Sequence, residues 1–431
     1  MDGPEHPCDR DRDAGAPDPL RRHAAADPPV PFGADGDRPR RPRLCPPLPR
    51  GGHPGRRRGD HPLGHAPPSA LPAGRVLRTI GERWRDDVAA AQDPELARIR
   101  RWLSGGPTAG PPDSLPGAGR NRLAALAARR WTADAWLWRK AEAGPADAAY
   151  LHTSHIRLDR PELFRWLDAR PDVRPVVFVH DLIPIAFPEY GVPGEALRHR
   201  RRMATVAERA AAILVNSADV AGGLDRHLVE AKLRRPPIRV APLGVERAFD
   251  TGVAGRDGRP YFVVCSTIEA RKNHLLLLQV WRDLAGRLGP DTPALVVVGR
   301  RGWESEAAVD LLDRCEAIRP HVIEASGLST AGLAELMAGA RALLMPSFAE
   351  GYSIPIAEAL SLGTPAIASD IAVHREVSKG RARLIDPLDG TGWREVIVQA
   401  GGDGPSDRVT GYAAPRWEEH FAIVDEVLAG L

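Results

Sequence analysis

The stretch that decides the fold is Pro346-Ser-Phe-Ala-Glu350-Gly-Tyr-Ser-Ile-Pro-Ile-Ala-Glu358-Ala-Leu-Ser-Leu-Gly363-Thr-Pro365. It follows one short apolar segment, 342–345, and it leads into a second, 365–368. An apolar strand, a turn that contains glycine, a helix and another strand predict a βαβ unit. Units of this kind bind ligands at the carboxyl ends of their strands.

Two carboxylates stand out within this stretch. Glu350 falls in the predicted turn and Glu358 falls in the predicted helix, so both can point into one crevice. Carboxylates accept pairs of hydrogen bonds from vicinal hydroxyls, which sugars and riboses offer. Taken alone, the pair would also fit two solvated acids near a helix N-terminus, where the helix dipole favours them. The rest of the chain has to decide between these interpretations.

Apolar, strand-like runs alternate with helix-like segments through the remainder of the patterned region. The expected strands are 149–152, 175–179, 212–215, 261–264, 294–298 and 321–324, and 238–244 is expected to form a strand and a turn. The expected helices are 75–103, 121–142, 161–169, 204–212, 274–288, 306–317, 329–339 and 415–428, with Ser217 capping a further helix. This alternation predicts an α/β protein with two doubly wound, Rossmann-like domains. We expect these domains at 75–245 and 246–414, followed by a C-terminal helix in 415–431 that crosses back to the first domain.

Composition and charge limit the function classes only weakly. The formal charge of +3 on 431 residues does not indicate a nucleic-acid partner. The four cysteines show neither metal-ligand spacing nor a disulfide framework, which favours a reducing cytoplasm and no bound metal. No apolar run reaches the ~18 residues of a membrane span, and no signal peptide is evident at the polar N-terminus.

The first 74 residues do not have the pattern of a domain. Residues 1–72 hold 17 of the 42 prolines and contain no Ile, Tyr, Trp or Lys, so they cannot bury enough apolar surface to offset their ordering entropy. A disordered basic tail is one interpretation. Our hypothesis is instead an out-of-frame translation of GC-rich coding sequence, because residues 35–49 read one nucleotide away can give a glycine turn and an amphipathic helix. Sequencing the gene tests this, since the hypothesis requires a single-nucleotide discrepancy.

Three further segments could carry chemistry at strand ends. Arg271 and Lys272 follow a strand and precede a helix, where cations are well placed for a diphosphate, although solvated basic residues would show the same pattern. His180 ends an apolar strand and could face the crevice or simply bond its neighbour Asp181. Gly299 opens the turn Gly-Arg-Arg-Gly, which resembles a phosphate-binding turn but lacks a full glycine-rich fingerprint.

Taken in order, His180-Asp181, the run Arg271-Lys272-Asn273 and the pair Glu350 and Glu358 resemble the family-4-like retaining glycosyltransferases (glycosyltransferase group 1). The resemblance covers about 175 to the C-terminus and is weaker from 75 to 174. It implies the glycosyltransferase B fold, in which two Rossmann-like domains face a cleft. The run 267–273 is similar to that of bacterial mannosyltransferase-like members that act on surface polysaccharides.

The resemblance implies a role for each matching position. Glu350 would bind donor-sugar hydroxyls, Lys272 would neutralise the leaving diphosphate, and His180 would help to position the sugar. These three residues form the implied catalytic set. The implied donor-binding set is Arg271, Gly351, Tyr352, Glu358, Ser266 and Gly299, where Gly351 and Tyr352 contribute backbone N–H groups and Glu358 binds the ribose. Many relatives have an arginine at the position of Ser266. The family's first strand and its Gly-rich loop are missing from 1–74 as translated.

We therefore expect a retaining hexosyltransferase that uses a nucleotide-diphosphate sugar, with no cofactor and no metal, and a glycan or a lipid-linked molecule as acceptor. It would be cytoplasmic, with possible peripheral contact with the inner membrane surface. The alternatives are a non-catalytic or defective sugar-nucleotide-binding homologue and a nucleotide-sugar epimerase on the same fold. The sequence does not identify the sugar, the base, the acceptor or the linkage.

Overall fold

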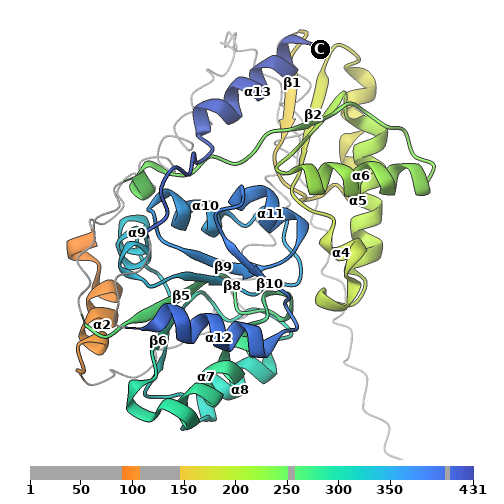
Figure 1. Cartoon of the computed structure of the whole chain (residues 1–431). Helices are drawn as coiled ribbons and strands as arrows, with labels where there is room; N and C mark the ends of the chain where they lie inside the picture. Colours follow the sequence, from red (N-terminus) through yellow and green to blue (C-terminus); the bar gives the residue numbers. More distant parts are fainter. Residues whose placement is uncertain (1–89, 107–145, 251–257, 403–407) are drawn as a thin grey trace, which may run out of the picture. The chain divides into compact units, whose positions relative to one another are not determined.

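The structure is a computed structural model that describes residues 90–106, 146–250, 258–402 and 408–431. Within these residues there are two parallel sheets, one of four strands and one of six (Figure 1). The segment 1–74 and the expected helix 121–142 lie outside the described residues, as does most of the expected helix 75–103.

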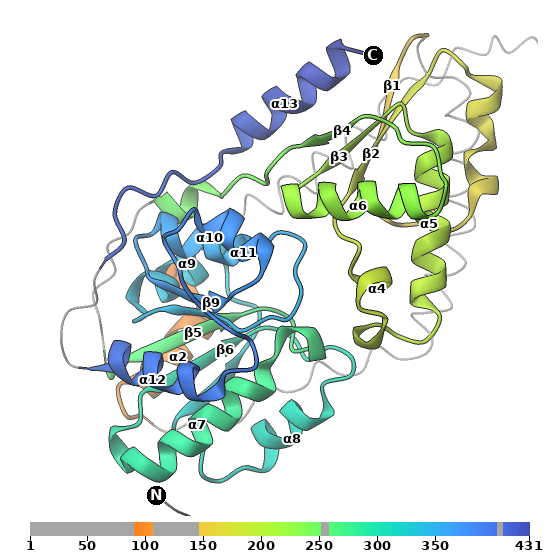
Figure 2. The same cartoon turned by 45° about the vertical axis from the view of Figure 1, so that its right-hand side comes forward.

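The first sheet has its strands in the order β1-β2-β3-β4. Their bounds are Ala149–His152, Arg174–Val179, Ala212–Val215 and Ile238–Val240. One face is covered by α5 (Glu195–Arg209) and α6 (Ala218–Glu230), which lie beside β2 and β3 in Figure 2. Ser217 caps α6 as predicted, because its hydroxyl accepts the N–H of Val220 at 3.2 Å.

Smaller elements complete this half of the chain. Residues Pro161–Ala169, expected as a helix, form the 3-10 helix η2, and β2 leads into α4 (Ile183–Ala186) and the 3-10 helix η3 (Pro188–Tyr190). The C-terminal helix α13 (Trp417–Ala429) packs on the other face of the first sheet, where Val424 joins Phe178 in one apolar cluster.

The second sheet has the order β10-β9-β8-β5-β6-β7, with all strands parallel. In chain order from β5 the bounds are Tyr261–Cys265, Ala294–Val298, Val322–Ala325, Leu343–Met345, Ala366–Ser369 and Arg383–Ile385. These strands are largely buried on both faces, which is why they are continuous apolar runs in the sequence.

Two layers of helices cover the second sheet (Figure 1). One layer consists of α7 (His274–Leu288), α8 (Glu306–Arg314) and α12 (Gly390–Gly401). The other consists of α9 (Thr330–Gly339), α10 (Ile354–Ser361) and α11 (Ala372–Ser378). The βαβ unit predicted around Glu350 is therefore present as β8, α10 and β9.

Helix α2 (Pro94–Leu103) differs from the expectation. It falls within the segment 75–245 assigned to the first domain, but it packs against α9 and β7 of the second sheet. Its apolar side is buried there in the same cluster as α9 and α10. Asp93 anchors its start by accepting the N–H of Ser329 at 2.7 Å, and Arg98 donates to the carbonyl oxygen of Glu324 at 2.6 Å.

Candidate active site at the carboxyl ends of β5 and β8

The strand order of the second sheet marks one edge for ligand binding. Numbered from β5 along the chain, the strands lie in the order 3-2-1-4-5-6, so the direction in which successive strands are added to the sheet reverses between β5 and β8. In open α/β sheets, ligands bind outside the carboxyl ends of the strands at this switch point. The turn after β5 contains Arg271 and Lys272, and the turn after β8 contains Glu350, so the topology brings together residues that are 78 or 79 positions apart.

These three side chains form a buried ionic cluster. The Lys272 ammonium lies 2.5 Å from Glu350 Oε1, and the Arg271 guanidinium lies 3.1 Å from Oε2. The Ser347 hydroxyl donates to Oε1 at 2.7 Å, and Arg271 also pairs with Glu269 at 2.6 Å. The Glu350 side chain is only 6% exposed, so its charge depends on these partners.

The balance of forces on Glu350 favours its ionised form. Burial alone would raise the pKa of this carboxyl, but attraction to Lys272 and Arg271 and the hydrogen bonds from Lys272 and Ser347 hold the pKa below its usual value. The negative charge is therefore already compensated before any ligand arrives.

Glu358 lies on α10 in a different electrostatic environment. Its carboxylate makes no hydrogen bond or ion pair with any residue in the described part of the chain. Burial, followed by the negative charge of Glu246, raises its pKa to about 7. Burial also raises the pKa of the Cys265 thiol at the end of β5 to about 12, an effect that Glu358 strengthens and Lys272 opposes. Glu358 and Lys272 thus both act on the end of β5.

The turn that carries Glu350 touches the end of strand β2 at His180. A Cβ added to Gly351 would lie 2.6 Å from the carbonyl oxygen of His180, so only glycine fits this approach. The Ser217 hydroxyl donates to the carbonyl oxygen of Gly351 at 3.0 Å. The His180 ring donates from Nε2 to the carbonyl oxygen of Thr153 at 2.8 Å, because a carbonyl can only accept. In the neutral ring this leaves the Nδ1 lone pair available.

The remaining predicted residues, Ser266, Gly299 and Tyr352, differ in the contacts that they make. The Ser266 hydroxyl is 3.4 Å from His274 Nε2. A Cβ on Gly299 would lie 1.9 Å from the carbonyl oxygen of Ser266, which gives this glycine a steric role. The Tyr352 ring is buried in the core, and its hydroxyl donates to the carbonyl oxygen of Leu243 at 3.1 Å. The side chain of Tyr352 is therefore committed to the core, and the contribution expected of this residue is its backbone N–H alone.

Sequence reasoning did not identify two partners of the cluster, Ser347 and Glu269, or a contact between α11 and the start of α6. Ser347 and Glu269 both lie within three residues of a predicted site residue, and that proximity was the available signal. Glu376 on α11 accepts the backbone N–H groups of Ala218 and Asp219 at the start of α6, at 2.7 and 3.2 Å. No local pattern could have revealed that contact, because the partners are about 158 residues apart.

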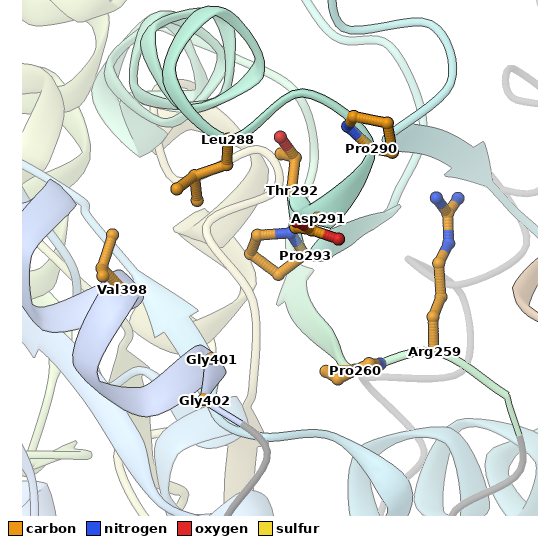
Figure 3. A pocket seen from close by; sticks show the side chains of 10 residues that line it. All are labelled: Arg259, Pro260, Leu288, Pro290, Asp291, Thr292, Pro293, Val398, Gly401 and Gly402. Carbon is orange, nitrogen blue, oxygen red and sulfur yellow. The ribbon is translucent and has the colours of Figure 1, made fainter.

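Other candidate sites in the described residues are separate from this cluster. A cavity of about 480 Å³ lies beside Arg259, Pro260 and Pro293 at the amino ends of β5 and β6 (Figure 3), at the edge opposite to Glu350. The described residues contain no set of three or more His, Cys, Asp and Glu side chains arranged to hold a metal ion. None of the described helices combines the length and apolar character needed to cross a bilayer.

Part of the chain is similar in sequence to known glycosyltransferases. The family model of the group 1 glycosyl transferases matches residues 247–414. The serotype-specific mannosyltransferase WbdA of Escherichia coli is 27% identical over an alignment of 223 residues, and this match covers 47% of this chain and 27% of WbdA. The O-antigen chain mannosyltransferase B of Escherichia coli is 32% identical over an alignment of 155 residues, and this match covers 33% of this chain and 40% of that protein. The chain therefore spans well under half the length of these curated relatives.

Solved structures show the same architecture at low sequence identity. HepE of Anabaena, solved with UDP and glucose, matches 69% of this chain and 81% of its own with a TM-score of 0.55 and 16% identity. Sucrose-phosphate synthase of Thermosynechococcus elongatus matches 65% of this chain and 73% of its own with a TM-score of 0.51 and 15% identity. The described chain has the two-sheet glycosyltransferase B fold, and its residues 247–414 match the family model of the group 1 glycosyl transferases.

Proposed function

We propose that this chain is a retaining hexosyltransferase that moves a sugar, with mannose as the leading candidate, from a nucleotide diphosphate to a glycan or lipid-linked acceptor. The observation that carries the proposal is the buried ionic cluster of Arg271, Lys272 and Glu350 at the switch point of the second sheet. The names of the mannosyltransferase relatives and the UDP and glucose bound to HepE support the substrate classes.

Each residue has a defined task in this proposal. The donor diphosphate competes with Glu350 for the cations of Lys272 and Arg271, which frees the Glu350 carboxylate to accept hydrogen bonds from sugar hydroxyls. Glu358, which has no partner in the described residues, accepts the ribose hydroxyls. His180 lies beside the turn of Gly351 and helps to orient the sugar. The two fixed cations replace a divalent metal, and the proposal requires no other cofactor.

The chemical step retains the anomeric configuration. The bond between the anomeric carbon and the β-phosphate oxygen breaks, and negative charge develops on the departing diphosphate. Lys272 and Arg271 stabilise that charge in the transition state. The acceptor hydroxyl oxygen then bonds to the same face of the sugar, and its proton passes to the leaving phosphate oxygen.

Donor hydrolysis and transfer by the purified chain, measured against common UDP- and GDP-hexoses, test this proposal. Glu350→Gln keeps the shape of the side chain but removes its charge, and we expect transfer to fall by about two orders of magnitude. Glu335→Gln is the matched control, because it loses an ion pair with Arg100 in the same domain but away from the cluster. Near-normal turnover by Glu350→Gln would refute the assignment. Donor binding without turnover by any form would favour the non-catalytic alternative.

A further inference from the structure

Four aromatic side chains converge beside the ionic cluster. They form an aromatic patch of Phe187, Tyr190, Trp303 and Phe348. The rings of Tyr190 and Phe348 stack with centroids 5.8 Å apart and planes 9° apart, and Phe187 stacks on Tyr190 at 6.1 Å. Trp303 donates its indole N–H to the carbonyl oxygen of Tyr190 at 3.3 Å. The patch therefore joins the loop after β2 with loops after β6 and β8.

The patch remains open to solvent although its members are large and apolar. Trp303 is 51% exposed and Phe187 is 37% exposed. Isolated exposed aromatics need no explanation, but several that stack on one another form a continuous apolar surface. Aromatic rings that are fixed by stacking can bind a ligand without a large loss of side-chain entropy.

The patch adjoins the residues assigned to the donor. Phe348 is two positions before Glu350, and its backbone N–H donates to the carbonyl oxygen of Arg271 at 2.8 Å. The Arg271 guanidinium in turn donates to the carbonyl oxygen of Ala349 at 3.0 Å. A molecule on the patch would therefore lie next to the sugar that Glu350 is proposed to hold.

Two of the aromatic residues have a glutamate as a direct neighbour in the sequence. Glu189 precedes Tyr190 and Glu304 follows Trp303, and both are exposed. Neither carboxylate has a hydrogen bond or an ion pair among the residues that the structure describes. A sugar ring suits this combination, because its C–H face can pack on an aromatic ring while its hydroxyls donate to carboxylates. An anionic lipid surface does not suit it, because the carboxylates would repel the headgroups.

We propose that the aromatic patch binds a sugar ring of the acceptor, so that the acceptor of this enzyme is a glycan. This inference rests on the proposed function, since it gives the patch the acceptor role in the same transfer reaction. Trp303 is the main specificity-determining residue, because it is the most exposed ring of the four.

Steady-state transfer to mannotetraose tests the proposal. We expect Trp303→Ala to raise the acceptor KM about tenfold, and by much more than the donor KM, because only the acceptor packs on the ring. Trp303→Phe keeps an aromatic face and should restore most of the affinity. Phe421→Ala is the matched control, because Phe421 is a 55% exposed aromatic on α13, and it should leave both constants unchanged. An unchanged acceptor KM in Trp303→Ala would overturn the inference.

A second measurement separates this inference from the proposed function. If the wild-type chain transfers no sugar, the proposed function fails, and quenching of tryptophan fluorescence by mannotetraose then decides on the patch. Quenching that is present in the wild type and absent in Trp303→Ala supports a glycan subsite, and no quenching overturns it. Sedimentation with phosphatidylglycerol vesicles that depends on Trp303, without any glycan effect, would assign the patch to a lipid surface instead.

Discussion

Replacing Glu358 by glutamine should change how the stability of the protein depends on pH. Burial and the nearby Glu246 raise the pKa of Glu358 from 4.5 to about 7. The folded protein thus holds this proton more tightly than the unfolded chain does. The resulting contribution to stability is complete below pH 4.5 and is lost as the pH rises through about 7. Each tenfold change in proton affinity corresponds to 1.36 kcal/mol, so from pH 5 to pH 8 the wild type should lose about 2.5 kcal/mol that Glu358→Gln retains.

Urea unfolding of the two proteins at pH 5 and pH 8 measures this difference. Glu358→Gln should gain stability relative to the wild type at pH 8 while its affinity for a nucleoside diphosphate falls, because the amide is a weaker acceptor for ribose hydroxyls. Glu395→Gln on α12, where the carboxylate is 69% exposed, is the control and should show the same offset at both pH values. A stability difference between Glu358→Gln and the wild type that does not vary from pH 5 to pH 8 would refute the reasoning.

Two pairs of variants test how the turn of Glu350 is positioned. Gly351→Ala places a methyl group 2.6 Å from the carbonyl oxygen of His180, so it should lower kcat at least about tenfold. Gly286→Ala in α7 is the control, because its methyl group meets no atom within 4 Å and should stabilise the helix by up to about 1 kcal/mol. Equal kcat values for the two variants would contradict this reasoning. Ser217→Ala and Ser329→Ala each remove a helix cap worth about 1 kcal/mol, so the two variants should lose similar amounts of thermal stability. Only Ser217 also bonds Gly351, so only Ser217→Ala should slow transfer.

The sequence predicted the βαβ unit because this unit depends on short-range patterns, but it did not predict that Arg271 and Lys272 pair with Glu350. The turn and helix around Glu350 follow from the glycine, the proline and the apolar runs on either side. The position of Arg271 and Lys272 directly after a strand indicated a place at a sheet edge, and in the structure both residues pair with Glu350. The two-sheet fold was predicted correctly for the same reason, because buried parallel strands are continuous apolar runs.

The packing of α2 could not be predicted in the same way. Its apolar stripe shows that the helix must bury one face, but a stripe of Leu and Ile does not specify which of two apolar surfaces it covers. The deciding contacts are the bonds of Asp93 to Ser329 and of Arg98 to Glu324, which join residues more than 220 positions apart. The contact of Glu376 with the start of α6 has the same character, since nothing near either partner in the sequence indicates it.

The two glutamates of one sequence run have opposite electrostatic environments in the folded chain. Glu350 is ionised because Lys272 and Arg271 compensate its burial, and the pKa of this carboxyl is lowered. Glu358 is buried without a cation, and its pKa is raised to about 7. Titratable groups in one site that are pushed in opposite directions mark different roles. Under the proposed function, Glu350 exchanges an existing partner for the ligand, whereas Glu358 gains its first partner from the ligand. Binding at Glu358 should therefore draw a larger share of its free energy from hydrogen bonds that the ligand-free protein lacks.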